Sequence, residues 1–398
     1  MTREEIYNAC LSSMTESNCL LLEAATGLGK SKISIDLVNN LYETQFKDKH
    51  VKMLLLVAKT VHKQTWKDEF EKWGGIKADE VVIECYESLK KHRCEYFDFI
   101  LMDEVHHVKS DVRIDLLETL QFKYMIGLSA TIPRNLKMYF KYKYHSKIVS
   151  CDIIEAIEDE VLPEPEILLF PLQLNNTDAS ETWEINPKSK GPVVYGQYKD
   201  LWRYKKHKVH AILSCTQKQK SNELNALALF WKNRFNQTRN EGIKQLWLRT
   251  CGDRLEFYAS TKLPVIKKIL EKLQEYRTIT FCKTIAQAEQ VVKWCIHSKN
   301  GKADEYYQRF NKKKIHHITA VNILNENANL VDCKYAVFCN LSSSEVVIPQ
   351  RLGRAMRHKQ PVIIVPYYQG TREEEIVEKM FAGYNQDFIR IIHSVDEI

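Results

Sequence analysis

The sequence predicts an α/β protein made of two parallel-sheet lobes with a helical insertion between them. In the first third of the chain, short apolar runs alternate with amphipathic segments, and this alternation returns after residue 254. Continuous apolar strands separated by helices are typical of a parallel sheet that helices cover on both faces. We therefore divide the 398 residues into a first lobe (1–160), a linker (161–174), a basic helical insertion (175–253) and a second lobe (254–398).

Each element is predicted from a local pattern. Apolar runs predict strands at Leu20–Leu22, Met53–Ala58, Val81–Glu84, Phe97–Met102, Tyr124–Leu128, Thr278–Phe281, His316–Ala320, Tyr335–Cys339 and Val362–Val365. Amphipathic spacing predicts helices at Ser31–Leu41, Val61–Trp73, Pro264–Tyr276, Ile285–Ser298 and Thr371–Ala382. The opening TREE is a capping box, with Thr2 as the N-cap and Glu5 reaching back, so a helix should run to about Glu16.

Composition excludes several classes of protein. With 44% hydrophobic and 27% charged residues, the chain can bury sizeable cores and is not a disordered polymer. The 11 cysteines are scattered without metal-ligand spacing, which indicates reduced thiols. The N-terminus is polar, and no run approaches the roughly 18 apolar residues of a membrane span. We therefore expect a soluble, cytoplasmic protein.

The positive charge is unevenly distributed. Residues 188–254 hold 15 Lys and Arg against 4 Asp and Glu, a local balance of +11, whereas the total is +7. This concentration suits a polyanionic partner such as nucleic acid. The alternative is an ordinary solvated surface. Aromatic residues of the same segment, such as Trp202 and Trp231, either stack on bases or pack a small helical core.

Residues 22–35, LEAATGLGKSKISI, pass from an apolar run through a glycine turn into a helical pattern. In that context glycines let backbone N–H groups face a phosphate at the start of a helix. We predict that the triphosphate of a nucleotide is bound by Ala25, Thr26, Gly27, Leu28, Gly29, Lys30 and Ser31. Lys30 would reach the β and γ phosphates, and the Ser31 hydroxyl would bind Mg²⁺. The alternative is an ordinary turn.

The stretch FDFILMDEVHHV ends an apolar strand in two carboxylates, Asp103 and Glu104. Open α/β sheets bind ligands at the carboxyl ends of their strands. We therefore predict that Asp103 holds Mg²⁺ and that Glu104 polarises the attacking water, with helix capping as the alternative. His106 lies two residues further on. Ser129 and Thr131 of GLSATIPR are predicted to hydrogen-bond to His106 and the acids, and so to couple the nucleotide to movement of the sheet.

Arginines recur at every third position of PQRLGRAMRHKQ, as Arg351, Arg354 and Arg357. On a helix they lie along one face. Guanidinium groups suit a phosphoryl group that gains charge in the transition state. We therefore predict that this segment completes the triphosphate site, with a solvated basic helix as the alternative.

Together these segments resemble the superfamily 2 helicases, in particular the DExH type found in DNA repair and in phages. AATGLGKS looks like motif I, DEVHH like motif II, SAT like motif III, RTITFCKTIAQAEQ like motif IV, ITAVNILNENANL like motif V and QRLGRAMR like motif VI. TWKDEF and CYESL look like motifs Ia and Ib.

This resemblance implies two RecA-like lobes that close on ATP and Mg²⁺ while the protein moves along nucleic acid, with DNA favoured over RNA. Contacts with the nucleic acid would be to phosphates and would not read sequence. From the second lobe, Gln350, Arg354 and Arg357 would reach the γ phosphate. The resemblance also implies that nucleic acid contacts Lys59, Thr319 and Asn327.

Three departures from the family pattern bear on function. Ala58 and Lys59 stand where motif Ia usually has Pro-Thr, and Asn327 replaces the glycine of motif V. No glutamine precedes the phosphate loop in residues 1–30, so selectivity for adenine is not implied. Two other functions stay open: an ATP-switched nucleic-acid binding protein or RNA helicase without processive DNA unwinding, and a phosphotransferase acting on a small molecule.

Overall fold

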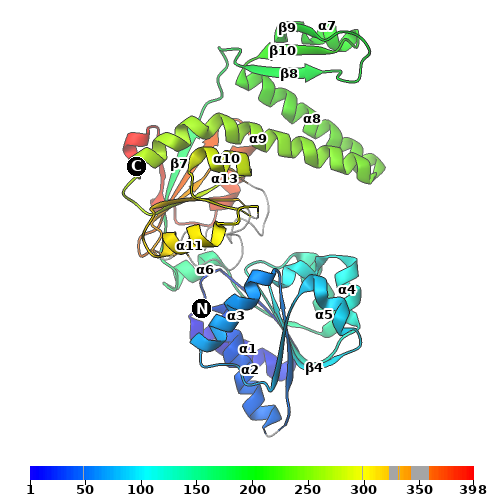
Figure 1. The fold of residues 1–398 in the computed structure, drawn as a ribbon, viewed down its shortest axis with the longest axis vertical. Helices are drawn as coiled ribbons and strands as arrows, with labels where there is room; N and C mark the ends of the chain where they lie inside the picture. The colour runs from blue at the N-terminus through cyan, green and yellow to red at the C-terminus, as the bar shows by residue number, and fades with distance from the viewer. Residues whose placement is uncertain (48, 298, 322–329, 331, 342–357) are drawn as a thin grey trace.

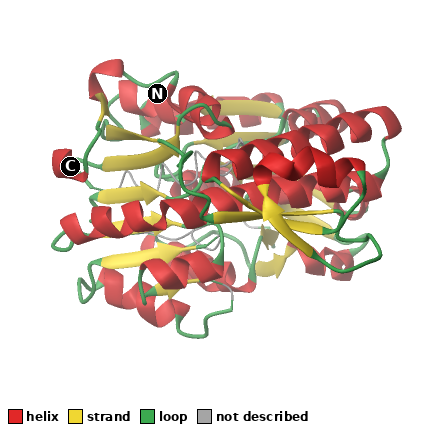
Figure 2. Cartoon of the chain, turned by 90° about the horizontal axis from the view of Figure 1, so that it is seen from above, coloured by secondary structure: helices red, strands yellow, loops and turns green. Residues whose placement is uncertain are grey.

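A computed structural model of the chain describes residues 1–398 apart from 48, 298, 322–329, 331 and 342–357. In this part of the chain, two large parallel sheets form separate lobes, and a small sheet with two long helices extends from the second lobe (Figure 1). Seen from above, helices flank the strands of both lobes (Figure 2). These observations confirm the predicted α/β class with two parallel-sheet lobes.

Across the described residues, the first lobe has a 6-stranded parallel sheet in the order β3-β2-β4-β5-β1-β6. Its strands are β1 (Cys19–Ala24), β2 (Lys52–Val57), β3 (Glu80–Cys85), β4 (Tyr96–Asp103), β5 (Gln121–Ser129) and β6 (Lys147–Cys151). Its α-helices are α1 (Arg3–Glu16), α2 (Lys30–Leu41), α3 (Thr60–Lys72), α4 (Asp111–Glu118), α5 (Arg134–Tyr144) and α6 (Ile153–Glu158). A short π-helix lies at Tyr42–Phe46, and 3₁₀-helices lie at Tyr86–His92 and Val105–Lys109.

The continuous apolar runs have a simple physical origin. Along β1, Leu20 and Leu22 pack in the core on one face of the sheet, while Cys19 and Leu21 pack in the core on the other. Because both faces are buried, neighbouring positions must all be apolar. The capping box of α1 is also present, since the Thr2 hydroxyl accepts from the Glu5 N–H and the Glu5 carboxylate accepts from the Thr2 N–H.

The second lobe has a 7-stranded parallel sheet, again counted over the described residues, in the order β12-β13-β11-β14-β15-β7-β16. Its strands are β7 (Glu166–Leu172), β11 (Thr278–Phe281), β12 (Cys295–Ile296), β13 (His317–Ala320), β14 (Tyr335–Phe338), β15 (Val362–Tyr368) and β16 (Ile389–Ile391). Its helices include α10 (Ile285–Val291), α11 (Ala303–Asn311) and α13 (Arg372–Phe381), and two short turns lie at Gln386–Phe388 and Val395–Glu397.

The predicted linker 161–174 is wrong over β7. This strand lies inside the second sheet, paired with β15 along Glu166–Leu172 and with β16 along Ile167–Leu169. The prolines at 163, 165 and 171 suggested a connector. However, Ile167 and Leu168 are fully buried. The burial of these side chains favours a strand in the sheet more strongly than the neighbouring prolines favour a connector. The chain therefore enters the second lobe directly after α6.

The predicted helical insertion is wrong in part, because it also contains a sheet. The strands β8 (Glu181–Ile185), β9 (Val194–Gln197) and β10 (Ala211–Cys215) pair in the order β8-β10-β9 and pack against the short helix α7 (Leu201–Lys206). Two long helices follow, α8 (Gln217–Thr238) and α9 (Glu241–Lys272). In β10, Ala211, Leu213 and Cys215 are buried and alternate with partly exposed residues, as expected for a strand with one buried face. This pattern was not recognised because basic and aromatic residues surround it in the sequence.

Helix α9 also corrects the predicted helix start at Pro264, which lies inside it. A proline there removes one hydrogen bond, and the buried side chains Ile266 and Ile269 on the next turn pack into the second lobe. A buried ion pair joins α9 to this lobe. Lys262 donates to Glu373 of α13 at 2.7 Å and to the Pro366 carbonyl at 3.2 Å, with both charged side chains at most 1% exposed.

Two chemical properties of the chain are visible in the structure, the state of its cysteines and the apolar length of its helices. All 11 cysteines are free thiols. Burial raises the pKa of Cys10, Cys19 and Cys333 to about 12, so these thiols stay protonated and unreactive near neutral pH. Among the described helices, none is long and apolar enough to cross a membrane.

Candidate nucleotide site

The predicted phosphate loop connects the end of β1 to the start of α2. Gly27 and Gly29 have positive φ angles of 109° and 85°, which favour glycine, and Gly29 is the N-cap of α2. Two backbone bonds hold the loop: Ala25 N–H donates to Cys151 O at 2.9 Å, and Leu28 N–H donates to Ala25 O at 3.3 Å. The N-terminus of a helix that emerges from such a loop favours an anion.

Two cations flank this loop. The Lys30 ammonium donates to the carbonyl oxygens of Ala24, at 2.8 Å, and Ala25, at 3.4 Å, so its charge lies across the loop. The Arg3 guanidinium donates to Gly27 O at 3.2 Å from the start of α1. Arg3 was not predicted, because no motif links this helix to the loop in sequence.

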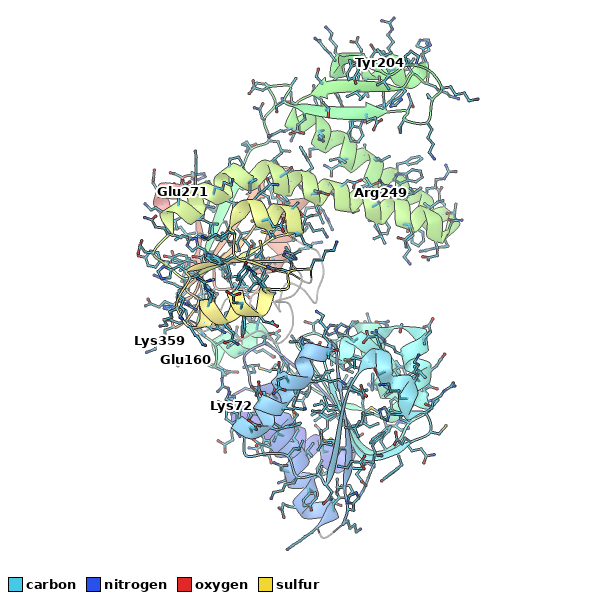
Figure 3. The ribbon with its side chains drawn as sticks, viewed as in Figure 1. Lys72, Glu160, Tyr204, Arg249, Glu271 and Lys359 are labelled. Atoms are coloured by element: carbon cyan, nitrogen blue, oxygen red, sulfur yellow. The ribbon has the colours of Figure 1, made fainter. Side chains whose placement is uncertain are left out.

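A cavity of about 720 Å³ opens over the loop, a volume in the range of small-molecule sites. It is lined by Arg3, Glu4, Tyr7, Thr26, Gly27, Leu28, Gly29, Lys30, Ser31, Lys32, Ile33, Asp36, Thr65, Trp66, Glu69, Lys72, Trp73, Asp103 and Glu104. The structure thus brings together nearly the whole predicted loop, except the buried Ala25, with both predicted acids. Helices α1, α2 and α3 supply most of the remaining wall, and Lys72 marks the end of α3 (Figure 3).

Two segments hold Asp103 in place. The buried Trp66 indole N–H donates to Asp103 Oδ2 at 2.8 Å, and the buried Tyr86 hydroxyl donates to the Asp103 backbone oxygen at 2.9 Å. Burial beside Asp103 and Glu104 raises the pKa of Tyr86, which keeps the hydroxyl a donor. Trp66 lies in TWKDEF and Tyr86 in CYESL, so the segments that resemble motifs Ia and Ib both contact the acid strand.

Neither Trp66 nor Tyr86 was predicted as a site residue. The tryptophan in a polar helix and the tyrosine after β3 were visible in the sequence, but the sequence does not say which strand they contact.

Glu104 belongs to a buried hydrogen-bond network with His106 and Ser129. Its backbone is left-handed, with φ 54° and ψ 57°, an unusual conformation for glutamate that turns the chain sharply after β4. The Ser129 hydroxyl lies 3.1 Å from Glu104 Oε2 and 2.9 Å from Thr131 O, two acceptors for one proton. His106 Nδ1 lies 2.9 Å from Ser129 Oγ and 3.3 Å from Glu104 Oε2. The side chains of Glu104, His106 and Ser129 therefore meet, whereas Thr131 contacts Ser129 through its backbone. The coupling role of these residues stays a prediction.

The donor set fits Mg²⁺. Ser31, at the start of α2, and Asp103, at the end of β4, line one cavity and offer a hydroxyl and a carboxylate. Mg²⁺ prefers oxygen ligands and usually keeps several waters, so one or two protein ligands suffice. The cavity also has the lining that a triphosphate needs, because the loop residues from Thr26 to Ser31, including Lys30, border it.

Two further predicted residues that the structure describes, Lys59 and Thr319, do not line this cavity. Lys59 is exposed and directly precedes α3. Thr319 is fully buried in β13, where its hydroxyl contacts Cys295 Sγ at 2.8 Å and the Ala288 carbonyl at 3.3 Å. This gives Thr319 a packing role, and its contact with nucleic acid stays a prediction. Outside the described residues lie Asn327, Gln350, Arg351, Arg354 and Arg357.

Two family models and a phage protein match parts of the chain. Residues 2–134 match the family described as type III restriction enzyme, res subunit, and residues 261–359 match the helicase conserved C-terminal domain. Over 178 residues the chain is 24% identical to a protein of Escherichia phage T5 named as a probable helicase. The alignment covers 40% of this chain and 36% of the phage protein.

Solved structures share the fold at low identity. The ATP-dependent type ISP restriction-modification enzyme LlaBIII bound to DNA has a TM-score of 0.57 and 13% identity, covering 99% of this chain and 31% of that one. Dbp5 of S. cerevisiae, bound to RNA and ADP BeF3, has a TM-score of 0.59 and 10% identity, covering 99% and 90%. The two-lobe architecture is therefore common to proteins solved with DNA and with RNA.

Proposed function

We propose that the chain is a superfamily 2 helicase and, more specifically, an ATP-dependent DNA helicase or translocase of the DExH type. The proposal is carried by one observation: the phosphate loop and the buried acid pair line the same cavity. An ordinary turn would explain the loop alone, and helix capping would explain the acids alone. Hydrolysis of a triphosphate requires both features at one site, and they do line one cavity.

In the proposed reaction each residue has a separate task. Bound ATP would supply the phosphoryl group, and Mg²⁺, when bound, would neutralise charge on the phosphates. Lys30 and the loop amides would hold the β and γ phosphates, while Ser31 and Asp103 would hold the metal. Glu104 accepts a proton from the attacking water, and its bond from Ser129 orients that carboxylate.

We further propose that nucleic acid acts on this site through α3. Lys59 precedes the helix, and Trp66, about two turns further on, holds Asp103. A strand that contacts the start of α3 would therefore shift or fix the metal-binding carboxylate. His106, Ser129 and Thr131 would report the state of the nucleotide in the opposite direction.

From the second lobe, we propose that Gln350, Arg354 and Arg357 reach the γ phosphate when the lobes close, and that Thr319 and Asn327 lie on the side of the strand. Arg357→Ala should then lower turnover with little loss of nucleotide binding, because the guanidinium acts in the transition state. Lys359→Ala removes a neighbouring exposed cation and serves as the control. Equal turnover in the two variants would contradict a site shared between the lobes.

DNA is proposed rather than RNA because of the phage relative and the DNA-bound restriction enzyme among the structural neighbours. The RNA-bound Dbp5 favours the alternative of an RNA helicase. A cytoplasmic location, that of a host cell if the protein is from a phage, is part of the same proposal.

ATP hydrolysis measured in parallel with no polymer, single-stranded DNA, duplex DNA and RNA tests the function. We expect DNA to stimulate turnover most, with displacement of a labelled strand from a partial duplex. Stimulation without displacement would favour an ATP-switched binding protein, and stimulation by RNA alone an RNA helicase. Turnover that ignores all polymers would favour a small-molecule phosphotransferase.

A further inference from the structure

The two long helices of the insertion form an antiparallel hairpin whose two halves differ. Near the second lobe the hairpin is packed: Leu224 and Tyr258 are buried, Ser221 Oγ lies 2.7 Å from the Tyr258 hydroxyl, and Arg254 donates to Asn225 at 2.8 Å. The last buried side chains are Ala228 on α8 and Thr250 on α9. In the intervening residues 229–249, all of which are described, no side chain is buried. We call this segment the hairpin tip.

The hairpin tip exposes more apolar surface than a solvated turn needs. Four large apolar side chains are between 42% and 57% exposed: Leu229, Phe230, Leu246 and Leu248. Figure 1 shows the two helices meeting clear of both large sheets, and Figure 3 places Arg249 on this part of α9. Exposed apolar groups gathered on one projection indicate an interaction surface.

Charge identifies the kind of partner. The hairpin tip carries one acid, Glu241, against five cations, Lys232, Arg234, Arg239, Lys244 and Arg249. Aromatic rings lie among these cations: Phe235 stacks on Trp247 with ring centres 6.1 Å apart, and Arg239 and Lys244 lie 5.7 and 5.8 Å from the Phe235 ring. Cations that follow a phosphate backbone, interleaved with aromatic and apolar faces, are the surface chemistry that binds unpaired nucleic acid.

We propose that the hairpin tip is a second DNA contact, which holds a single strand by its phosphates through the cations and by its bases through the exposed apolar side chains. This inference rests on the proposed function, because it assigns the tip to the same polymer. A protein partner with an apolar face is disfavoured by the density of positive charge, whereas a single strand brings phosphates for the cations and bases for Phe230 along one polymer.

The test uses the full chain and a fluorescein-labelled oligo(dT) strand, with binding measured by anisotropy over a series of salt concentrations. Lys232→Gln/Arg234→Gln/Arg249→Gln removes three cations for which the structure gives no ion pair. With about 0.7 counterions released per phosphate contact on single strands, affinity at 0.1 M salt should fall about 100-fold, and the salt slope should decrease by about 2. The matched control Lys188→Gln/Lys190→Gln/Lys199→Gln removes the same charge elsewhere in the insertion and should bind normally.

A second variant separates bases from phosphates. Phe230→Ala should weaken oligo(dT) binding about 10-fold, but should leave binding to heparin, a polyanion without bases, unchanged. Because Phe230 is exposed, the thermal unfolding midpoint should not move, and light scattering should give the same mass as the wild type. Normal oligo(dT) binding by both hairpin variants would overturn the inference, as would a wild-type dimer that Phe230→Ala dissociates without changing DNA binding. If the wild type binds no DNA, the proposed function fails first.

Discussion

In the nucleotide cavity of the first lobe, the acids are buried and each has a hydrogen-bond donor within reach, whereas in the hairpin tip the cations are exposed and the apolar side chains are uncovered. The cavity is organised before any ligand arrives, because a buried carboxylate without donors would be costly. The tip has no such requirement and gains binding energy from many weak contacts. Single substitutions should therefore have large effects in the cavity, and small, salt-dependent effects at the tip.

The largest effect should follow from Glu104→Gln. An amide keeps the shape of the side chain but cannot accept a proton from water, so turnover should fall roughly 1,000-fold. ATP binding, measured with a fluorescent analogue, should stay within about 2-fold of wild type, because the amide keeps the shape of the side chain. A factor of two corresponds to about 0.4 kcal/mol of binding free energy. Comparable loss of binding and turnover would show that Glu104 holds the ligand instead of acting on water.

Lys30→Ala should come next. Removing the ammonium from the loop takes one charged donor from the triphosphate, and turnover should fall about 100-fold with weaker ATP binding. Lys32→Ala is the control, because Lys32 lines the same cavity but forms an i,i+4 ion pair with Asp36. A similar loss in both variants would mean that general positive potential, and not the Lys30 position, matters.

Trp66→Phe tests whether a hydrogen bond from a neutral donor, the Trp66 indole N–H, also contributes to metal binding in the cavity. Without the indole N–H, the Asp103 carboxylate loses the donor that orients it, and the Mg²⁺ concentration needed for half-maximal ATP binding should rise about 10-fold. Trp73→Phe is closely matched: its indole donates to Glu69 at 2.8 Å and its ring lines the same cavity. An equal Mg²⁺ requirement in the two variants would remove Trp66 from the metal site.

The smallest effect should come from a single cation of the hairpin tip. Lys232→Gln should weaken oligo(dT) binding only about 5-fold at 0.1 M salt, and the difference should vanish near 1 M. Anisotropy at the two salt concentrations measures it. A salt-independent loss would mean that the tip, like the cavity, depends on one organised contact.

The same difference explains what could be predicted from sequence. Loop and acid motifs are local: glycines at 27 and 29 need only their own backbone, and Asp103 and Glu104 need only the end of their strand. Strands buried on both faces, such as β1, also reveal themselves as continuous apolar runs. Trp66, Tyr86 and Arg3 were not predicted as site residues, because their roles depend on contacts between segments that are distant in the sequence.

Errors in the fold have a related cause. In β7, prolines gave a strong local signal for a connector, but burial in the second sheet overrode it. In α9, Pro264 suggested a helix start, although packing of the next turns and the Lys262 ion pair carry the helix through. The sheet of the insertion is only half-buried, so its alternation was lost among basic residues.

The buried Lys262–Glu373 pair joins α9 rigidly to the second lobe, so the hairpin should move together with that lobe. It fixes the C-terminal part of a 32-residue helix in the second lobe, and at 1.5 Å per residue the first residue of that helix, Glu241 in the hairpin tip, lies about 30 Å from Lys262. If the second lobe rotates by about 10° during each nucleotide cycle, a rigid arm of that length swings its far end by about 5 Å. A small hinge motion would thereby become a stroke close to the spacing between neighbouring nucleotides, delivered by a part of the protein that never touches ATP.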